Sequence, residues 1–269
     1  MFEYASALGI AKKKDARVVI PSDSFLLAAF NLTAIVVNPL FYKYLIDVQR
    51  SLMRYEKKSS AYDADLVNKS FSDSQRQFEL IDGYMQSFLY FEESKSIIKQ
   101  EFTFLPNISR RAEERLKNIS LQHSKPLNQT FIGVHNRHGD IAHEAFGPSL
   151  GYALATEQYF EKALSYFRSK YKNPVFLVAS DDMNWTMTAL QKYQKGDVYY
   201  LTNETREVDM ATLIMCNHTI ASTITFSWWS AYLTGGEVIY YKDWPTKNSR
   251  LEKTVVKKEY FPSSWIGMA

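Results

Sequence analysis

The sequence has little of several features that would assign it to a specialised class. Its 269 residues include one cysteine, Cys216, so no intrachain disulfide can form. By itself, a single cysteine favours a reducing compartment such as the cytosol. The best candidate for a membrane span, residues 25–41, is short and contains Asn31, Asn38 and Pro39. We interpret this run as a core helix followed by a strand.

Excess charge is also lacking. The 32 basic and 29 acidic residues are well mixed and leave a net charge of only +3, too small to indicate binding to nucleic acid or to a membrane surface. A small anion would need only local positive charge. The hydrophobic content of 46 % and the length of 269 residues predict one large or two medium globular domains.

Glycosylation sequons, by contrast, are abundant. Of twelve asparagines, eight lie in Asn-x-Ser/Thr, where residue usage alone would give roughly two. This excess indicates a protein that is located in the lumen of the secretory pathway. If it is located there, we expect that its targeting segment is missing from this chain. Asn184 and Asn217 lie inside predicted elements, and we expect them to stay unmodified. The eight are Asn31, Asn68, Asn107, Asn118, Asn128, Asn184, Asn203 and Asn217.

The carboxyl-terminal half alternates apolar strands with amphipathic helices. Such alternation predicts a doubly wound parallel sheet with helices on both faces. The predicted strands are residues 131–135, 175–179, 198–201, 218–222 and 237–241, and the helices are 156–171, 183–194, 208–216 and 226–233.

The amino-terminal half is less regular but also mixes helices and strands. We expect a polar surface excursion at 57–77 and a linker at 118–129, which gives domains 1–126 and 127–269. The expected helices are 1–14, 24–30, 41–55, 92–101 and 108–116, and the expected strands are 17–21, 34–37 and part of 78–90.

Polar residues follow three of the predicted strands, at His135–Asp140, Ser180–Asp182 and Ser222–Ser227. The carboxyl ends of parallel strands meet at one rim of a sheet, where ligands bind in open α/β folds. Arg137 suits an anion because its guanidinium is a rigid fork of donors, and Gly139 permits a close backbone approach. A strand-end turn with an ordinary surface arginine would give the same pattern.

The hydroxyls of Ser222–Ser227 also have two interpretations. They could cap the following helix or, with its free amides, hold a phosphate opposite Arg137. Asp209 begins the preceding helix, where a carboxylate favours the helix dipole. Its carboxylate could instead accept hydrogen bonds from the adjacent N–H donors of guanine.

A metal site is a rival hypothesis. Hard and imidazole ligands cluster within ten residues and would suit a metal-dependent phosphoesterase, although no helical His-Glu-x-x-His spacing is present. Asp63-Ala64-Asp65 matches the Asp-x-Asp signature of metal-dependent glycosyltransferases, but in a polar loop we interpret it as a solvated acidic pair. The clustered ligands are His135, His138, Asp140, His143 and Glu144.

Several segments together resemble the α-1,2-fucosyltransferases, which carry an HxRRGD motif. HNRHGD at 135–140, SDDMNW at 180–185, DMATLIMCNHTIAST at 209–223 and TFSWWSAYLTGG at 225–236 match this family in order. GYMQSFLYF at 83–91 resembles the family's GYxQSWKYF, and the opening MFEYASALGIAKK and the late YFPSSWIG also fit. The resemblance therefore covers essentially the whole chain.

The resemblance implies a GT-B-like α/β fold of two Rossmann-like domains, an acceptor-side domain over 1–126 and a donor domain over 127–269. It implies inverting transfer of fucose from GDP-fucose to the 2-hydroxyl of a galactose, without an obligatory metal. It also implies a type II Golgi membrane protein whose anchor is absent from residues 1–269. The implied donor-binding residues are His135, Arg137, Gly139, Ser180, Asp181, Asp209, Thr225, Phe226 and Ser227.

The sequence departs from this family in two ways. His138 stands where the family has its second arginine, which we expect to weaken donor binding by about 1–2 kcal/mol. The Gly-rich turn that precedes the opening helix in the family is missing, so we expect this chain to be poorly active or inactive. Arg137 would stabilise the leaving phosphate, and Asp140 and Glu144 are the two candidates for the catalytic base that takes the acceptor proton. A non-catalytic nucleotide- or glycan-binding relative is the alternative.

Overall fold

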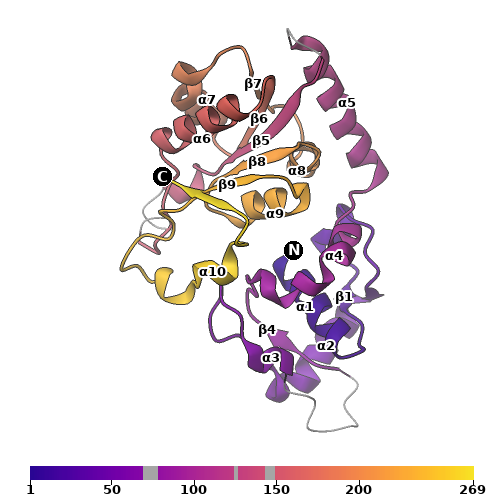
Figure 1. Cartoon of the computed structure of the whole chain (residues 1–269). Helices are drawn as coiled ribbons and strands as arrows, with labels where there is room; N and C mark the ends of the chain where they lie inside the picture. The colour runs from indigo at the N-terminus through magenta and orange to yellow at the C-terminus, as the bar shows by residue number, and fades with distance from the viewer. Residues whose placement is uncertain (69–77, 124–126, 143–148) are drawn as a thin grey trace. The chain divides into compact units, whose positions relative to one another are not determined.

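The computed structural model describes residues 1–68, 78–123, 127–142 and 149–269, which form two compact units (Figure 1). Unit 1 comprises residues 1–105 and 254–263, and unit 2 comprises residues 106–253 and 264–269. The expected linker at 118–129 is wrong at its start, because helix α5 (Pro106–Gln122) continues to Gln122. This helix packs on α8 (Arg206–Ile214), so it belongs to unit 2 and the division falls at Leu105.

Unit 2 is built on a parallel sheet, which has six strands among the described residues. Their order is β10-β9-β8-β5-β6-β7, and each neighbouring pair is parallel. The five predicted strands are confirmed, and β10 is an addition that the sequence did not indicate. The strands are β5 (Thr130–Asn136), β6 (Pro174–Ser180), β7 (Val198–Tyr200), β8 (His218–Ala221), β9 (Val238–Tyr241) and β10 (Ile266–Met268).

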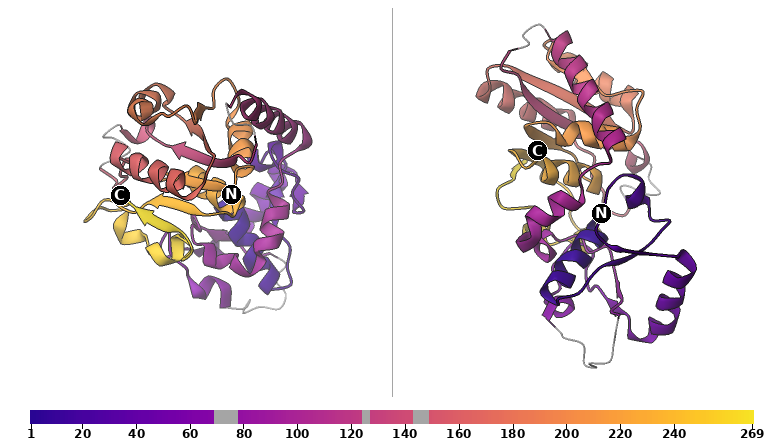
Figure 2. Two further views of the ribbon diagram at one scale, coloured as in Figure 1. Left: turned by 45° about the horizontal axis from the view of Figure 1, so that its top comes forward. Right: turned by 90° about the vertical axis from the view of Figure 1, so that its right-hand side faces the viewer.

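Helices cover both faces of this sheet, as a doubly wound fold requires (Figures 1 and 2). Helix α6 (Glu157–Lys170) packs with α7 (Met183–Leu190), while α8 packs with both α5 and α9 (Thr225–Thr234). Side chains on β6 alternate between the faces: Val175, Leu177 and Ala179 join the cluster formed with α5 and α8. The central strands are buried on both sides, which explains their uninterrupted apolar sequence.

The tryptophan pair of α9 lies in the core. Trp228 and Trp229 are 2 % and 1 % exposed, and the Trp228 ring stacks on Tyr232 with centroids 4.8 Å apart. Helix α9 ends at Gly235, whose φ of 72° is the left-handed conformation that glycine adopts without strain. The strand that follows can therefore turn back into the sheet.

Unit 1 contains two small parallel sheets, β1 (Val19–Pro21) with β2 (Ile35–Val37) and β3 (Arg54–Tyr55) with β4 (Ile81–Asp82). The apolar strand expected within 78–90 shrinks to β4, because the chain then enters a 3-10 turn, η3 (Phe88–Tyr90). The other elements are α1 (Phe2–Lys13), η1 (Phe25–Ala28), α2 (Pro39–Gln49), η2 (Arg50–Leu52), α3 (Ala64–Asn68), η4 (Glu92–Ser94), α4 (Lys95–Glu101) and α10 (Lys257–Tyr260), with η7 (Glu252–Thr254) at the boundary.

The interpretation of residues 25–41 as a core helix and strand is wrong for much of this run. Phe25 is 86 % exposed, Leu40 is 79 % exposed and both Ile35 and Val36 of β2 are exposed. The run is apolar, but β2 is an edge strand and α2 buries only Leu45. Among the described residues, none of the helices is long and apolar enough to cross a membrane.

Candidate functional site

The strand order of unit 2 reverses between its two central strands. From β5 the chain proceeds outward through β6 and β7, whereas from β8 it proceeds the other way through β9 and β10. Ligands of open α/β sheets bind at such a switch point, beyond the carboxyl ends of the two strands. The HNRHGD segment leaves β5 there and the Ser222–Ser227 segment leaves β8. Two of the three predicted motifs therefore flank this position.

A chain of hydrogen bonds ties these two strand ends together. The backbone N–H of Arg137 donates to Ser222 Oγ at 3.0 Å, Ser222 Oγ lies 3.0 Å from Ser227 Oγ, and Ser227 Oγ lies 2.6 Å from His135 Nδ1. Burial lowers the pKa of the His135 imidazole to about 3, so the ring is neutral. The Phe226 ring packs against it with centroids 4.5 Å apart. We call these residues the β5–β8 hub.

Helix α9 begins at this hub with backbone donors that have no partner among the described residues. Its N-cap residue, Ile224, makes no side-chain cap bond, and the first helical hydrogen bond is donated by Trp228 to the Ile224 carbonyl at 3.0 Å. The amides of Thr225, Phe226 and Ser227 are therefore the orphan donors of the first turn. The capping interpretation of these hydroxyls is wrong, because Ser227 bonds to His135 and Ser222 instead. Free amides and a positive helix dipole together favour an anion.

A buried hydroxyl at the same turn also lacks a partner. Thr223 is 4 % exposed, and its Oγ1 has no hydrogen-bond partner among the residues that the structure describes. An unpaired buried hydroxyl costs about 1–3 kcal/mol in protein mutational data. A ligand oxygen at this turn would remove that cost. Sequence reasoning passed over Thr223 because a threonine after a strand has no distinguishing signal.

The Arg137 side chain turns toward carboxylates. Its Nε and Nη2 donate to the two oxygens of Asp140 at 2.8 and 2.5 Å, and Nε lies 3.2 Å from Asp181 Oδ2. Within the described part of the chain, Nη1 has no hydrogen-bond partner. The fork holds the pKa of Asp140 below its ordinary value. Asp140 thus orients the guanidinium and leaves one nitrogen of the fork available.

Gly139 is required by the close approach of the β6 loop. A Cβ at this position would lie 2.5 Å from Asp181 Oδ2, and Asp181 Oδ1 accepts the His138 N–H at 2.9 Å. Ser180 accepts from the Asp182 N–H at 3.1 Å and from Thr186 Oγ1 at 2.8 Å. The third predicted motif therefore joins the other two, and all three loops meet at one rim as expected.

The His138 side chain is held at this rim by contacts with Trp185 and Asp182. Its imidazole stacks on Trp185 with centroids 3.9 Å apart and rings 14° from parallel, and its Nδ1 lies 3.0 Å from Asp182 Oδ2. Asp182 also caps α7 by accepting the Trp185 N–H at 3.0 Å. Sequence reasoning missed this pair, although an aspartate three residues before a helical tryptophan is an N-cap signal.

Asp209 lies on α8 and is held by a residue that sequence reasoning also missed. Arg115 of α5 donates from Nη1 to Asp209 Oδ1 at 2.6 Å and from Nη2 to the Thr202 carbonyl at 2.7 Å. Burial raises the pKa of Asp209, and the Arg115 guanidinium opposes that shift. The two residues are 94 positions apart. No local pattern in either helix indicates their pairing.

These contacts do not support the hypothesis that the clustered ligands form the metal site of a phosphoesterase. His135 binds Ser227, while His138 binds Asp182, so the two rings do not share a ligand. His143 and Glu144 lie outside the described residues. Among those described, no three histidine, cysteine, aspartate or glutamate side chains are grouped to hold a metal ion.

The Asp63-Ala64-Asp65 segment is not the solvated pair that its sequence suggested. Asp63 is only 8 % exposed, and its Oδ1 accepts the Asp65 N–H at 3.0 Å at the start of α3. Lys57 lies 3.4 Å from Asp63 and 2.5 Å from Asp65. The first aspartate therefore starts a helix, and the pair is held by one lysine.

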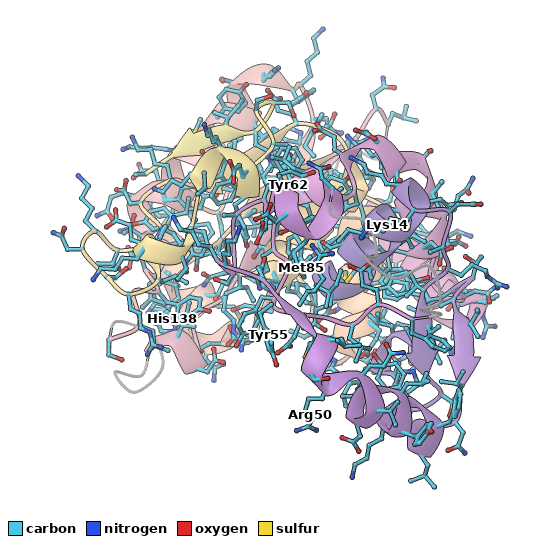
Figure 3. The ribbon with its side chains drawn as sticks, turned by 90° about the horizontal axis from the view of Figure 1, so that it is seen from below. Lys14, Arg50, Tyr55, Tyr62, Met85 and His138 are labelled. Carbon is cyan, nitrogen blue, oxygen red and sulfur yellow. The ribbon has the colours of Figure 1, made fainter. Side chains whose placement is uncertain are left out.

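The Gly83–Phe91 segment organises the interior of unit 1. The Met85 N–H donates to Glu56 Oε2 at 2.9 Å, Ser87 Oγ donates to the Glu259 carbonyl at 2.7 Å, and Tyr90 Oη accepts the Asp63 N–H at 2.9 Å. Figure 3 labels Met85 and Tyr62, whose ring packs on Tyr90 with centroids 5.0 Å apart. The segment thus links residues 56–63 to α10 and has a structural role.

The Glu56 carboxyl at the centre of this region should make stability depend on pH. Burial raises its pKa from 4.5 to about 7. A carboxyl whose folded pKa is raised favours the folded state when protonated, so stability falls as pH rises from about 4.5 to 7. After discounting for partial exposure, we expect a loss of about 1–2 kcal/mol.

Glu56→Gln should remove this loss, so the melting temperature of the variant relative to wild type should rise between pH 5 and pH 8. The matched control is Glu93→Gln, which removes an exposed carboxylate from a surface pair with Lys13. Parallel melting curves for wild type and Glu56→Gln across this range would contradict the assignment.

The fold and the site together define a class of protein, those that bind phosphorylated ligands. A doubly wound parallel sheet is typical of this class when a helix with free amino-terminal amides begins at its switch point. Among solved structures, the fold is similar to that of NodZ alpha-1,6-fucosyltransferase soaked with GDP-fucose, with a TM-score of 0.53, 14 % identity and 89 % of each chain covered. It is also similar to POFUT1 in complex with GDP-fucose, with a TM-score of 0.50, 14 % identity and 92 % of each chain covered. The chain has this GT-B-like α/β fold.

The family model for Glycosyl transferase family 11 matches residues 1–269, and the chain belongs to this family. A similar curated relative is galactoside 2-alpha-L-fucosyltransferase Sec1 of Mus musculus, 30 % identical over 274 residues, which cover all of this chain and 70 % of the relative. Another is galactoside alpha-(1,2)-fucosyltransferase 2 of Sus scrofa, 28 % identical over 271 residues, covering all of this chain and 76 % of the relative.

Proposed function

We propose that this protein transfers fucose from GDP-fucose to the 2-hydroxyl of a galactose in a glycan. Membership of Glycosyl transferase family 11 and the names of the curated relatives support the reaction and the acceptor. The similar structures of NodZ soaked with GDP-fucose and of POFUT1 in complex with GDP-fucose support the donor. The observation that carries the proposal is the start of α9. Three orphan amides lie there, together with the Thr223 hydroxyl, which has no partner among the described residues. Ser222, next to Thr223, accepts the backbone N–H of Arg137, whose guanidinium supplies the positive charge.

In this proposal unit 2 binds the donor. The diphosphate lies against the amides of Thr225, Phe226 and Ser227, and Arg137 donates from Nη1 to the β-phosphate. Arg137 is preorganised by Asp140 and Asp181, so little side-chain freedom is lost when the donor binds. The Asp209 carboxylate accepts the hydrogen bonds of guanine. His135 and Gly139 shape the wall of the site, as do Ser180 and Asp181 at the end of β6. Unit 1 supplies the acceptor side.

The proposed chemistry is a single inverting displacement. The galactose 2-oxygen attacks the anomeric carbon of fucose, the bond from that carbon to the β-phosphate oxygen breaks, and GDP leaves with the electron pair. Fixed donors stabilise the charge that develops on the leaving phosphate, which is the large electrostatic contribution of such sites. The acceptor proton passes to a carboxylate, for which Asp140 and Glu144 are the candidates.

Asp140 is better suited to orienting Arg137 than to accepting the proton. Its two oxygens are both engaged by the guanidinium, and its pKa is lowered by that contact. A general base is most effective when its pKa lies near the working pH. Glu144 lies outside the described residues and stays the second candidate for the base.

The test combines binding with product analysis. Calorimetry should show GDP binding to the 269-residue chain. A product of incubation with GDP-fucose and lactose, whose fucose NMR assigns to the galactose 2-hydroxyl, would support the transfer and would contradict the expectation that residues 1–269 are poorly active or inactive. Binding of GDP without transfer would favour the alternative of a catalytically impaired nucleotide- or glycan-binding relative. Absence of GDP binding at millimolar concentration would refute the donor site.

We also propose that the protein acts in the lumen of the Golgi. All eight sequon asparagines are exposed to solvent, including Asn184 and Asn217, which we expected to be protected inside elements. Expression in a secreting eukaryotic cell should therefore give N-linked glycopeptides at several of these positions. Mass spectrometry that finds every sequon unmodified would contradict this location.

A further inference from the structure

Helix α2 of unit 1 carries an apolar stripe on its solvent side. Residues four apart lie on one face of a helix, and large apolar side chains recur at this spacing from Leu40 to Leu52, where the following turn η2 ends. The members of this α2 stripe are between 43 % and 79 % exposed. They are Leu40, Phe41, Tyr44, Val48 and Leu52. Figure 3 shows side chains of this helix extending into solvent next to the labelled Arg50.

The stripe is not the face by which α2 packs on its own unit. Leu45 is buried, and Tyr42 and Ile46 beside it are half-buried. At about 100° per residue, the stripe residues fill a separate arc of about 120° on the helix. Single exposed apolar residues are ordinary, whereas a contiguous set is typical of an interaction surface. The α2 stripe therefore indicates an interface.

The area of the stripe matches the requirement of a dimer. With about 200 Å² for a fully exposed large side chain, its members together expose roughly 600 Å². Two copies packed stripe to stripe would bury about 1,200 Å² from these side chains alone, which is the lower end of stable protein interfaces. Polar side chains at the rim add to this area.

The charges beside the stripe are self-complementary. Lys43 and Asp47 are both exposed and lie one turn apart on the same side of it. In an antiparallel pair of identical helices, the same side of each helix faces the other across the seam. A two-fold axis near Tyr44 therefore brings Lys43 of each copy toward Asp47 of the other, so that opposite charges meet twice. The same axis places Leu40 of each copy toward Val48 of the other.

We propose that the α2 stripe is the interface of a homodimer, in which two copies of this chain pack α2 against α2 in antiparallel orientation. The apolar stripe supplies the buried centre, and the Lys43–Asp47 pairs set the orientation. A lipid surface fits less well, because a membrane-bound amphipathic helix carries mainly basic residues on its polar side, whereas here Asp47 lies between Lys43 and Arg50. The contact closes with two copies, so it predicts a dimer and no larger assembly.

Sedimentation velocity of the unglycosylated 269-residue protein tests this interface. The sedimenting mass should rise with concentration to twice the chain mass of 31.2 kDa, with a dissociation constant of about 1–10 µM for an interface of this size. Tyr44→Glu should weaken the dimer by at least about 100-fold, because it places two carboxylates at the axis. The matched control is Tyr55→Glu, which changes a tyrosine of β3 that is 61 % exposed and should leave the dimer intact.

A charge exchange tests the orientation of the two helices. Lys43→Glu alone should weaken the dimer by about tenfold, because carboxylates then face each other twice across the seam. The double variant Lys43→Glu/Asp47→Lys restores two contacts of opposite charge and should return the dissociation constant to within about threefold of wild type. All of these positions are exposed, so melting temperatures measured at a concentration where each protein is monomeric should stay close to wild type.

Four outcomes would overturn the proposal. A protein that stays monomeric at about 100 µM has no such interface. A dimer that survives Tyr44→Glu uses another surface. A dimer that Tyr44→Glu disrupts but that the charge exchange does not rescue associates through apolar contact without the proposed orientation. A monomer that floats with phosphatidylcholine vesicles, and loses this binding in Tyr44→Glu, would assign the stripe to a membrane surface instead.

Discussion

Arg137→Ala should weaken GDP binding by about 10- to 100-fold, or ~1.5–3 kcal/mol, and should lower kcat/KM for fucose transfer by about 100- to 1,000-fold. The larger effect on transfer arises because the guanidinium meets charge that grows as the β-phosphate departs. Arg137→Lys should recover only part of both, because an ammonium keeps the charge but not the fork that Asp140 and Asp181 orient. Calorimetry and initial-rate kinetics measure the two quantities.

A matched control exists in unit 1. Arg50, labelled in Figure 3, pairs with Asp47 three residues earlier at 2.8 Å, much as Arg137 pairs with Asp140 three residues later. Arg50→Ala should leave GDP binding and transfer unchanged. Melting temperatures of both variants should stay close to wild type, because each arginine is partly exposed and such pairs contribute about 0–1 kcal/mol. If Arg137→Ala binds GDP as tightly as wild type, the guanidinium is not part of the donor site.

The rim of unit 2 could be predicted because it depends on local patterns. An apolar run that ends in polar residues marks a buried strand and the end of that strand at once, and parallel strands bring those ends together. His135, Arg137 and Ser227 lie on one rim for this reason, but their segments are in contact because β5 and β8 are neighbours. The switch point between β5 and β8 could not be predicted, since it depends on which strands pair across long loops.

Other features escaped prediction because they depend on contacts distant in sequence. The ring stack of His138 on Trp185 and the Arg115–Asp209 pair join residues from separate elements. The buried state of Asp63 and the exposure of Phe25 contradict their chemical character, since composition gives tendencies of burial and not the position of a side chain. The domain boundary failed similarly, because the polar surface of α5 is typical of a linker as well as of a helix.

The second large effect concerns recognition of the guanine ring of the donor. Asp209→Ala should reduce the preference for GDP over ADP by about 10- to 100-fold, because a site built to hydrogen-bond one ring loses discrimination when the acceptor is removed. Affinity for ADP should change little, since the diphosphate contacts at α9 stay intact. Asp209→Asn tests charge apart from shape: its amide keeps one acceptor oxygen, so the preference should fall by less. Competition calorimetry with the two nucleotides measures the ratio.

The interpretation requires that Arg115 act through Asp209. Arg115 holds the carboxylate by one oxygen and the Thr202 carbonyl by its second nitrogen, so Arg115→Ala should loosen the carboxylate and lower the preference only in part. In the double variant Asp209→Ala/Arg115→Ala, no uncompensated guanidinium stays half-buried, and the preference should equal that of Asp209→Ala alone. A double variant that restores the preference for GDP would show that Asp209 only neutralises Arg115. Guanine would then have to be recognised by other residues of unit 2.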